Sequence, residues 1–193
     1  MSYMVVEKFR LLISLIFTKV YFPKAKIVRF PSVFRGKRYF KYGRGFVSGY
    51  NCRIDVVDNV NNLDFVIDFG SNVQINDSVH IAAGKKILIG NDVLIASRVF
   101  ITDHNHGSFP EENEFLIPVA HRKLSFNSVI IHDNVWLGEG VFVMPGVTIG
   151  KNSIIGAGSV VTKSIPENVI AVGNPAKIIK SFCLESNSWR TVG

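Results

Sequence analysis

An aliphatic residue recurs every six positions in the second half of the chain, and this period restricts the fold more than any other feature of the sequence. The leading positions are Ile131, Leu137, Val143, Ile149, Ile155 and Val161, with upstream counterparts at Phe69, Ile75, Ile81, Ile89, Ile95 and Ile101. A second small or aliphatic residue follows each downstream position by four. A period of six fits neither the 3.6-residue repeat of an α-helix nor the two-residue alternation of a long strand.

Each six-residue unit is expected to form one short strand and a turn, with the leading side chain pointing inward. Three units then make one triangular coil. Four regular coils are predicted at residues 69–86, 89–106, 131–148 and 149–166, with a less regular coil before them. Such coils bury their core only by stacking on one another. The sequence therefore predicts an all-β solenoid, a parallel β-helix with capped ends.

The repeat divides the chain into three parts. Residues 1–40 are expected to form a basic, amphipathic helical cap, residues 41–166 the β-helix, and residues 167–193 a C-terminal extension with a short helix packed on the outside. Residues 107–127 keep no six-residue frame and are expected to form an excursion loop. Long loops in compact domains are usually functional or disordered, and the apolar residues of this one favour function.

The N-terminal segment carries the basic charge of the chain. Residues 1–44 contain eleven Lys or Arg and one acidic residue, Glu7, in a chain whose net charge is +7. The apolar run at residues 11–17 is too short to span a bilayer, which takes about 20 residues. A helix here would gather one apolar stripe, which consists of Met4, Val5, Phe9, Leu12, Ile13, Ile16 and Phe17. Two interpretations are open: the stripe caps the β-helix, or residues 1–22 contact an anionic membrane surface.

Composition narrows the classes of protein to which the chain can belong. A length of 193 residues suits one domain, and 47% hydrophobic content excludes a disordered tail. Cys52 and Cys183 make neither a disulfide framework nor a ligand pair. A cytoplasmic location is expected, peripheral at the inner membrane if the N-terminal segment binds lipid. No nucleic-acid partner is expected, because no recognisable motif accompanies the basic residues.

Three longer motifs carry a resemblance to a known family. ITDHNHG precedes the excursion, NVWLGEGVFVMPGVTIGKNSIIGAGSVVTKSIP covers the last coils, and GNPAKIIK follows them. With the six-residue frame, these motifs resemble the hexapeptide-repeat acyltransferases of the maltose and galactoside acetyltransferase type, closest to the O-acetyltransferases of bacterial lipopolysaccharide and capsule biosynthesis. The resemblance implies a left-handed β-helix, a homotrimer with active sites between subunits, acetyl-CoA as co-substrate and no metal.

The same resemblance assigns roles to individual residues. His104 matches the catalytic base, and an imidazole can take the proton of an attacking hydroxyl. The backbone N–H of Glu139 matches the oxyanion donor, although serine is common at that position. Trp136, Ala157, Thr162, Lys177 and Lys180 match positions along acetyl-CoA. Asn76, Asp103 and His106 are expected to bind the acceptor. If residues 103–106 form a strand, His106 shares a face with His104, and Asp103 points away from it.

The implied function is direct transfer of acetyl from acetyl-CoA to a sugar hydroxyl of a polysaccharide precursor, either lipopolysaccharide O-antigen or capsule, with a histidine base. Three alternatives are open. The chain could acetylate the amine of a nucleotide-linked amino sugar, or it could be a non-catalytic solenoid that binds glycans. Zinc chemistry is the third alternative, because some related trimers hold zinc through three histidines; the candidates are His80, His104 and His106.

Overall fold

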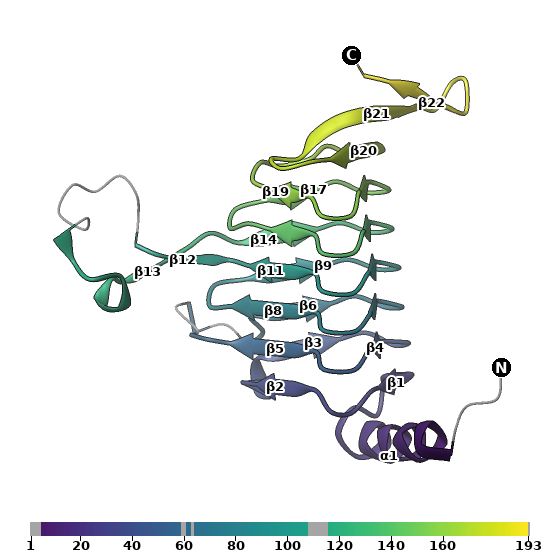
Figure 1. Ribbon diagram of the computed structural model, residues 1–193, viewed down its shortest axis with the longest axis vertical. Helices are drawn as coiled ribbons and strands as arrows, with labels where there is room; N and C mark the ends of the chain where they lie inside the picture. The colour runs from purple at the N-terminus through teal and green to yellow at the C-terminus, as the bar shows by residue number, and fades with distance from the viewer. Residues whose placement is uncertain (1–4, 59–60, 63, 108–115, 193) are drawn as a thin grey trace.

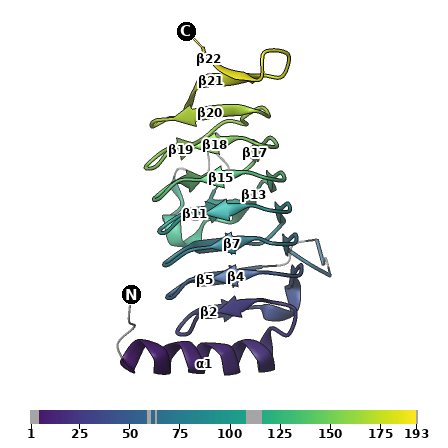
Figure 2. The ribbon, with the colours of Figure 1, turned by 90° about the vertical axis from the view of Figure 1, so that its right-hand side faces the viewer.

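The six-residue units form short strands that stack from one coil to the next (Figure 1). The computed structural model describes residues 5–58, 61–62, 64–107 and 116–192. Within these residues, the coils contribute their strands to three sheets, A, B and C, whose coil-to-coil pairings are parallel. Figure 2 shows the coils stacked edge-on above the N-terminal helix.

The strands of each sheet are given in spatial order. Sheet A contains β1 (Ile27–Val28), β4 (Val47–Ser48), β7 (Gln74–Ile75), β10 (Leu94–Ile95), β15 (Trp136–Leu137), β18 (Ile154–Ile155), β20 (Val169–Val172), β21 (Lys177–Cys183) and β22 (Ser188–Thr191). Sheet B contains β19 (Val160–Val161), β16 (Phe142–Val143), β11 (Phe100–Thr102), β8 (His80–Ala83), β5 (Arg53–Val56) and β2 (Val33–Arg35). Sheet C contains β17 (Thr148–Ile149), β14 (Val129–Ile131), β9 (Ile87–Ile89), β6 (Ile67–Phe69) and β3 (Phe40–Tyr42).

The leading aliphatic residues form the core, as the six-residue period predicts. In sheet A, Ile75 pairs with Ile95, Ile95 with Leu137, and Leu137 with Ile155, and all four are fully buried. Equivalent columns in sheets B and C are also buried. Gly138 lies where a Cβ atom would come within 2.6 Å of the Ala157 backbone nitrogen, so a larger residue would separate two coils.

Strands begin earlier in the chain than the repeat suggested. β1 pairs with β4 and β2 pairs with β5, so a partial coil lies within residues 1–40, followed by the 3-10 helix η1 (Lys37–Tyr39). The helical part of this segment is α1 (Val5–Tyr21), which covers the end of the stack (Figure 2). In the described part of the chain, no helix is long and apolar enough to cross a membrane.

The apolar stripe of α1 does not cap the coils, and that interpretation was wrong. Val5, Phe9, Leu12 and Ile16 are exposed, and only Phe17 of the stripe packs against the core; Met4 lies outside the described residues. The buried face instead carries Ser14 and Thr18. The physical reason is that the first strand of sheet A has an open edge, whose backbone groups require hydrogen-bond partners.

The predicted C-terminal helix was also wrong, because residues 177–191 form an antiparallel hairpin, β21–β22. β20 pairs with β18 in parallel and with β21 in antiparallel register. A helix at this position would have left one edge of β20 without backbone partners, whereas β21 pairs with that edge. The hairpin therefore extends sheet A beyond the last coil.

The excursion begins before the predicted residue 107. β12 (His104–His106) leaves the coil and pairs antiparallel with β13 (Leu124–Phe126), with η3 (Val119–His121) before β13. Figure 1 shows this hairpin projecting to one side of the stack. Residues 108–115 of the predicted loop lie outside the described residues.

The contact between α1 and β1 generates the first prediction. The Thr18 hydroxyl accepts a hydrogen bond from the Val28 N–H at 2.8 Å and is itself buried. Replacement of Thr18 by Val keeps the shape but leaves this N–H without a partner, so we expect a loss of about 1–3 kcal/mol in the free energy of unfolding. Urea denaturation measures this loss. Thr191→Val, at an exposed position of β22, is the control and should change stability by less than about 0.5 kcal/mol.

Candidate functional site

A buried carboxylate organises the corner between sheets B and C. The chain bends at Asp103, between β11 and β12, and turns this side chain inward, where it is fully buried. Its oxygens accept hydrogen bonds from the backbone N–H groups of Gly84, Lys85 and Lys86, which form the same corner one coil earlier. A buried charge requires such compensation. The expectation that Asp103 binds the acceptor is corrected, because its side chain has no exposed surface.

Asp103 also contacts His104, contrary to expectation. His104 Nδ1 lies 3.2 Å from Asp103 Oδ1 and 3.1 Å from the Thr102 hydroxyl oxygen. The physical reason is the bend: because residue 103 is not part of a strand, neighbouring side chains need not point to opposite faces. The His104 side chain is 14% exposed, and its ring lies beside Phe126 of β13 with ring centroids 5.9 Å apart. Among the described residues, no protein group hydrogen-bonds its Nε2.

His106 lies two residues farther along β12 and is exposed. Side chains two residues apart in a strand share a face, so His104 and His106 lie on the same side of the hairpin, as the sequence predicts. Gly84 lies beneath the Phe126 ring, and a Cβ atom at that position would overlap the ring. The hairpin therefore rests against the corner that holds Asp103.

Asn76 and Glu139 lie at another corner, between sheets A and B. Asn76 follows β7, Glu139 follows β15, and Ala157 follows β18 at the equivalent place in a later coil. Glu139 is exposed, and its carboxylate pairs with Arg98 at 2.5 Å. In the part of the chain that the structure describes, the Glu139 N–H donates to no protein acceptor. This corner thus presents a free backbone donor beside an ion pair.

A column of outward-facing side chains crosses sheet A from this region to the C-terminal hairpin. Backbone register aligns Trp136 with Ile154, Ile154 with Ile170, and Ile170 with Lys180. Trp136 is 48% exposed, and Lys180 and Lys177 are exposed on β21. Neighbouring strands are about 4.8 Å apart, so the column spans about 14 Å. It forms an apolar strip that ends in positive charge. Thr162 lies apart from it, at the end of β19 in sheet B.

Asn76 lines a surface pocket of ≈ 300 Å³ that sequence analysis did not find. The other lining residues are Arg29, Gly49, Tyr50, Gln74, Asp77 and Ser97. The Tyr50 ring lies under two guanidinium groups, with Arg10 at 4.6 Å and Arg29 at 5.8 Å from its centroid. Arg10 comes from α1, so Tyr50 links this pocket to the helical end of the stack. No motif marks these residues, because they come from four separate segments.

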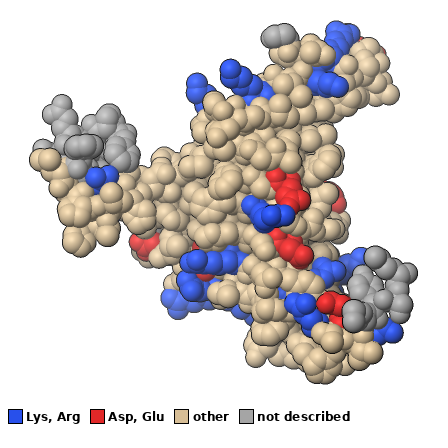
Figure 3. All heavy atoms as spheres, viewed as in Figure 1, with Lys and Arg blue, Asp and Glu red and all other residues tan. Residues whose placement is uncertain are grey.

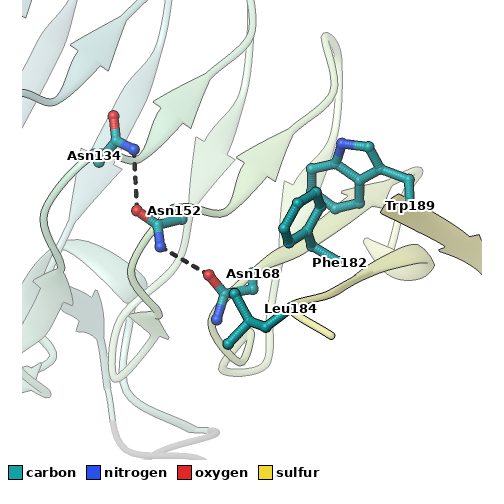
Figure 4. A pocket seen from close by; sticks show the side chains of 6 residues that line it. All are labelled: Asn134, Asn152, Asn168, Phe182, Leu184 and Trp189. Atoms are coloured by element: carbon teal, nitrogen blue, oxygen red, sulfur yellow. Dashed lines mark hydrogen bonds between the residues drawn. The ribbon is translucent and has the colours of Figure 1, made fainter. Parts of the chain in front are cut away.

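A second pocket lies at the corner between sheets C and A, away from the predicted site residues (Figure 4). Asn134, Asn152 and Asn168 are hydrogen-bonded in sequence at 3.0 and 2.7 Å. All three have left-handed backbone conformations, which asparagine tolerates better than most residues. Phe182, Leu184 and Trp189 of the hairpin line the other wall. The predicted C-terminal helix would not have produced this pocket.

His80 belongs to a charged cluster on the outer face of sheet B. Its Nε2 lies 3.7 Å from Asp55 Oδ2, and Asp55 also pairs with Arg53 and, at 3.8 Å, with Arg35. Burial lowers the pKa of His80, the Arg53 charge lowers it further, and Asp55 opposes both effects. The described residues contain no group of three or more His, Cys, Asp or Glu side chains placed to bind a metal ion.

The predicted residues therefore form two separate groups. His104 and His106 lie at the corner between sheets B and C, whereas Asn76, Glu139 and Ala157 lie at the corner between sheets A and B. Trp136, Lys177 and Lys180 continue the second group across sheet A. The outer face of sheet B separates the two corners.

Comparison with known proteins identifies relatives over most of the chain. Residues 128–163 match the family described as bacterial transferase hexapeptide (six repeats). Over 183 residues the chain is 44% identical to the putative lipopolysaccharide biosynthesis O-acetyl transferase WbbJ of Escherichia coli K12, covering 93% of this chain and 91% of that protein. Among solved structures, a maltose O-acetyltransferase from Clostridium difficile 630 has a TM-score of 0.61 and 35% identity, covering 75% of this chain and 71% of that one.

A second solved structure contains a bound acetyl donor. It is a hexapeptide-repeat acetyltransferase from Vibrio cholerae O1 biovar eltor in complex with acetyl coenzyme A, with a TM-score of 0.54 and 26% identity. The match covers 78% of this chain and 68% of that one.

The environment of His80 generates the second prediction. Because its pKa is lowered in the folded chain, the unfolded chain binds more protons below the ordinary value of 6.5. Stability should therefore fall as pH falls through and below that value. We expect the wild type to lose more unfolding free energy than His80→Gln between about pH 7.5 and pH 5 in urea denaturation. An NMR titration midpoint for His80 at or above 6.5 would contradict this explanation.

Proposed function

The chain belongs to the hexapeptide-repeat acetyltransferases, and from this premise we propose that it is an acetyl-CoA-dependent O-acetyltransferase. Its proposed acceptor is a sugar hydroxyl of a bacterial surface polysaccharide precursor, either lipopolysaccharide O-antigen or capsule. One observation carries the proposal. The His104 imidazole is held at Nδ1 by a buried carboxylate, while Nε2 has no protein partner among the described residues.

His104 is the proposed general base. With its proton on Nδ1, the imidazole donates to Asp103 and presents an unprotonated Nε2. Nε2 takes the proton of the acceptor hydroxyl as that oxygen attacks the thioester carbonyl carbon. The carbon–sulfur bond then breaks, and the imidazolium returns its proton to the leaving thiolate. Asp103 acts in this scheme as a positioning residue, because it reaches substrate only through His104.

The tetrahedral intermediate requires a donor for its oxygen, and we assign this role to the Glu139 N–H of a neighbouring subunit. Support comes from the placement of the two residues, because Glu139 and His104 lie at corners on opposite edges of sheet B within one chain. We accordingly propose a homotrimer with an active site between each pair of subunits. From family membership we also infer that the coils are left-handed.

Acetyl-CoA is proposed to lie along the outer face of sheet A. The apolar strip from Trp136 through Ile154 and Ile170 suits the pantetheine arm, and Ala157 borders it at the corner. Lys177 and Lys180 are then available to the nucleotide phosphates, as point charges. Thr162, which follows β19 of sheet B, lies apart from this strip. The bound acetyl coenzyme A of the Vibrio cholerae structure supports a donor of this kind.

The acceptor is proposed to enter through the pocket that contains Asn76, with His106 at the facing corner. Arg29 and Asp77 both line this pocket, and the Arg29 guanidinium beside the Tyr50 ring is the group that would pair with a sugar phosphate. The name of the Escherichia coli relative, a putative lipopolysaccharide biosynthesis enzyme, supports a polysaccharide precursor. We place the reaction in the cytoplasm, where acetyl-CoA is available and where free cysteines such as Cys52 persist.

Removal of the base is the third prediction. We expect His104→Ala to lower kcat by about 10²–10⁴-fold and to leave the Kd for acetyl-CoA within about twofold, because the imidazole acts on the acceptor proton. Steady-state kinetics with a lipid-linked or nucleotide-linked glycan, together with calorimetry, measure both values. His121→Ala, at an exposed position in η3, should retain full turnover. A glycan-binding protein without catalysis would function equally well with either substitution.

Removal of the phosphate-binding charges is the fourth prediction. The double variant Lys177→Ala, Lys180→Ala should raise the Kd for acetyl-CoA about tenfold or more in calorimetry, a loss of about 1.4 kcal/mol, because two exposed cations are removed from the donor phosphates. Lys151→Ala, Lys163→Ala removes two exposed lysines elsewhere and should leave the Kd unchanged. Equal affinities in the two double variants would exclude β21 from the donor site.

Product chemistry separates the proposed ester from an amide. Mild alkali hydrolyses an O-acetyl ester and leaves an N-acetyl group intact. Release of acetate from the purified product under these conditions supports O-acetylation. An alkali-stable product would instead indicate that the chain is an N-acetyltransferase.

A further inference from the structure

The amphipathic helix α1 is oriented with its polar face toward the protein. Ser14 and Thr18 are buried against the first partial coil, and Glu7 and Arg10 are half-buried along the same side. The Ser14 hydroxyl accepts a hydrogen bond from the Phe30 N–H, and the Thr18 hydroxyl accepts one from the Val28 N–H. The inner face of α1 therefore satisfies backbone groups at the open end of the stack.

The opposite face of α1 is apolar and has no covering element in the described part of the chain. Val5, Phe9, Leu12 and Ile16 follow one another at spacings of four, three and four, so they share one face of the helix. Their exposed fractions are 82%, 62%, 54% and 58%. Amphipathic helices usually turn this face toward a core. In α1 this apolar face is left in contact with solvent by the described residues, so its burial against a partner would be favourable.

Positive charge flanks one edge of this apolar face. Lys8 and Lys19 lie along one edge of it, and both are exposed. Lys24, Lys26 and Lys37 follow in the segments next to α1 and are exposed as well. Figure 3 shows basic side chains over the end of the stack that carries α1 and β2. A protein core or a symmetric contact between two such helices would bring like charges together, whereas an anionic surface would neutralise them.

We propose that α1 binds the surface of an anionic lipid bilayer, with Val5, Phe9, Leu12 and Ile16 in the headgroup region and the flanking lysines on the phosphates. Helices with a large apolar face and basic edges lie in the plane of the interface, about 5–10 Å deep. Each lysine near an anionic surface contributes about 1 kcal/mol, or about fivefold in affinity. The proposal concerns a surface distinct from the acetyl-transfer site.

The orientation of α1 determines how far the proposed acetyl-transfer site lies from the lipid surface. α1 lies across the end of the stack, so the coils stand away from the bilayer (Figure 2). Asn76 follows β7, the third strand of sheet A from that end, and β11, which precedes His104, is the fourth strand of sheet B from the same end. At about 4.8 Å per strand, these positions lie about 10 and 14 Å beyond the first coil. A glycan held on a lipid carrier in the same bilayer would reach the pocket that contains Asn76 before it reached His104.

The fifth prediction tests this surface with vesicles. The full-length chain should float with vesicles of phosphatidylcholine and phosphatidylglycerol, and much less with phosphatidylcholine alone. Phe9→Gln, Leu12→Gln should reduce the vesicle partition coefficient at least tenfold, because two exposed apolar side chains lose their burial in lipid. Lys8→Gln, Lys19→Gln should reduce it by about 25-fold at low salt, and this effect should shrink in high salt.

A matched control substitutes two leucines that are exposed elsewhere. Leu116→Gln, Leu184→Gln alters positions that are 84% and 76% exposed, and it should leave vesicle binding unchanged. Circular dichroism and light scattering check that each variant keeps its fold and its mass. Wild-type protein that fails to float with anionic vesicles, or an α1 variant that floats as well as the wild type, would overturn the proposal. If the wild type does not bind vesicles and an α1 variant changes the mass of the assembly, the apolar face of α1 contacts a second copy of the chain instead.

Discussion

The structure depends on the vertical stacking of inward aliphatic side chains, held in place by parallel backbone ladders. Columns such as Ile75, Ile95, Leu137 and Ile155 are continuous because each strand is in register with the equivalent strand one coil away. A shift of one residue would turn the core residues toward solvent, so the register is strongly specified. This constraint also fixes every corner, since each corner is the short segment between two registered strands. Groups far apart in sequence thereby become neighbours in space.

The chemistry of the corners follows from what the stacked coils leave unsatisfied. At one corner, three backbone N–H groups from residues 84–86 converge and bind the Asp103 carboxylate. The same carboxylate contacts His104 Nδ1, so the fold itself supplies the group that positions the proposed base. At the next corner, the stacked turns leave the Glu139 N–H without a protein acceptor among the described residues. The proposed catalytic groups are thus products of the solenoid geometry, and the proposed trimer would bring them together.

The two ends of the stack solve the same physical problem in different ways. A parallel sheet that stops exposes a row of backbone donors and acceptors. At the C-terminal end, β21 pairs antiparallel with β20. At the N-terminal end, hydroxyl groups of α1 bond to residues 28 and 30, which forces the helix to present its polar side inward. The apolar side is left for another partner, and the flanking lysines suit an anionic bilayer. Membrane attachment would therefore be a consequence of how the stack is capped.

The sequence by itself determined the repeating coil, the inward position of each leading aliphatic residue and the place of the excursion, because a six-residue period is a local property that survives in any context. Its motifs also indicated His104 and the residues along sheet A through resemblance. It could not determine the partner of His104, since that depends on a bend at Asp103 stabilised by residues nearly 20 positions earlier. It left the partner of the apolar stripe of α1 open and misjudged residues 177–191, because amphipathic spacing and strand propensity do not say which open edge needs a partner. The pocket around Asn76 and Tyr50 likewise required the folded chain, since four separate segments meet there. Only the tertiary structure decides such questions, because unsatisfied backbone groups exist only once the coils have formed.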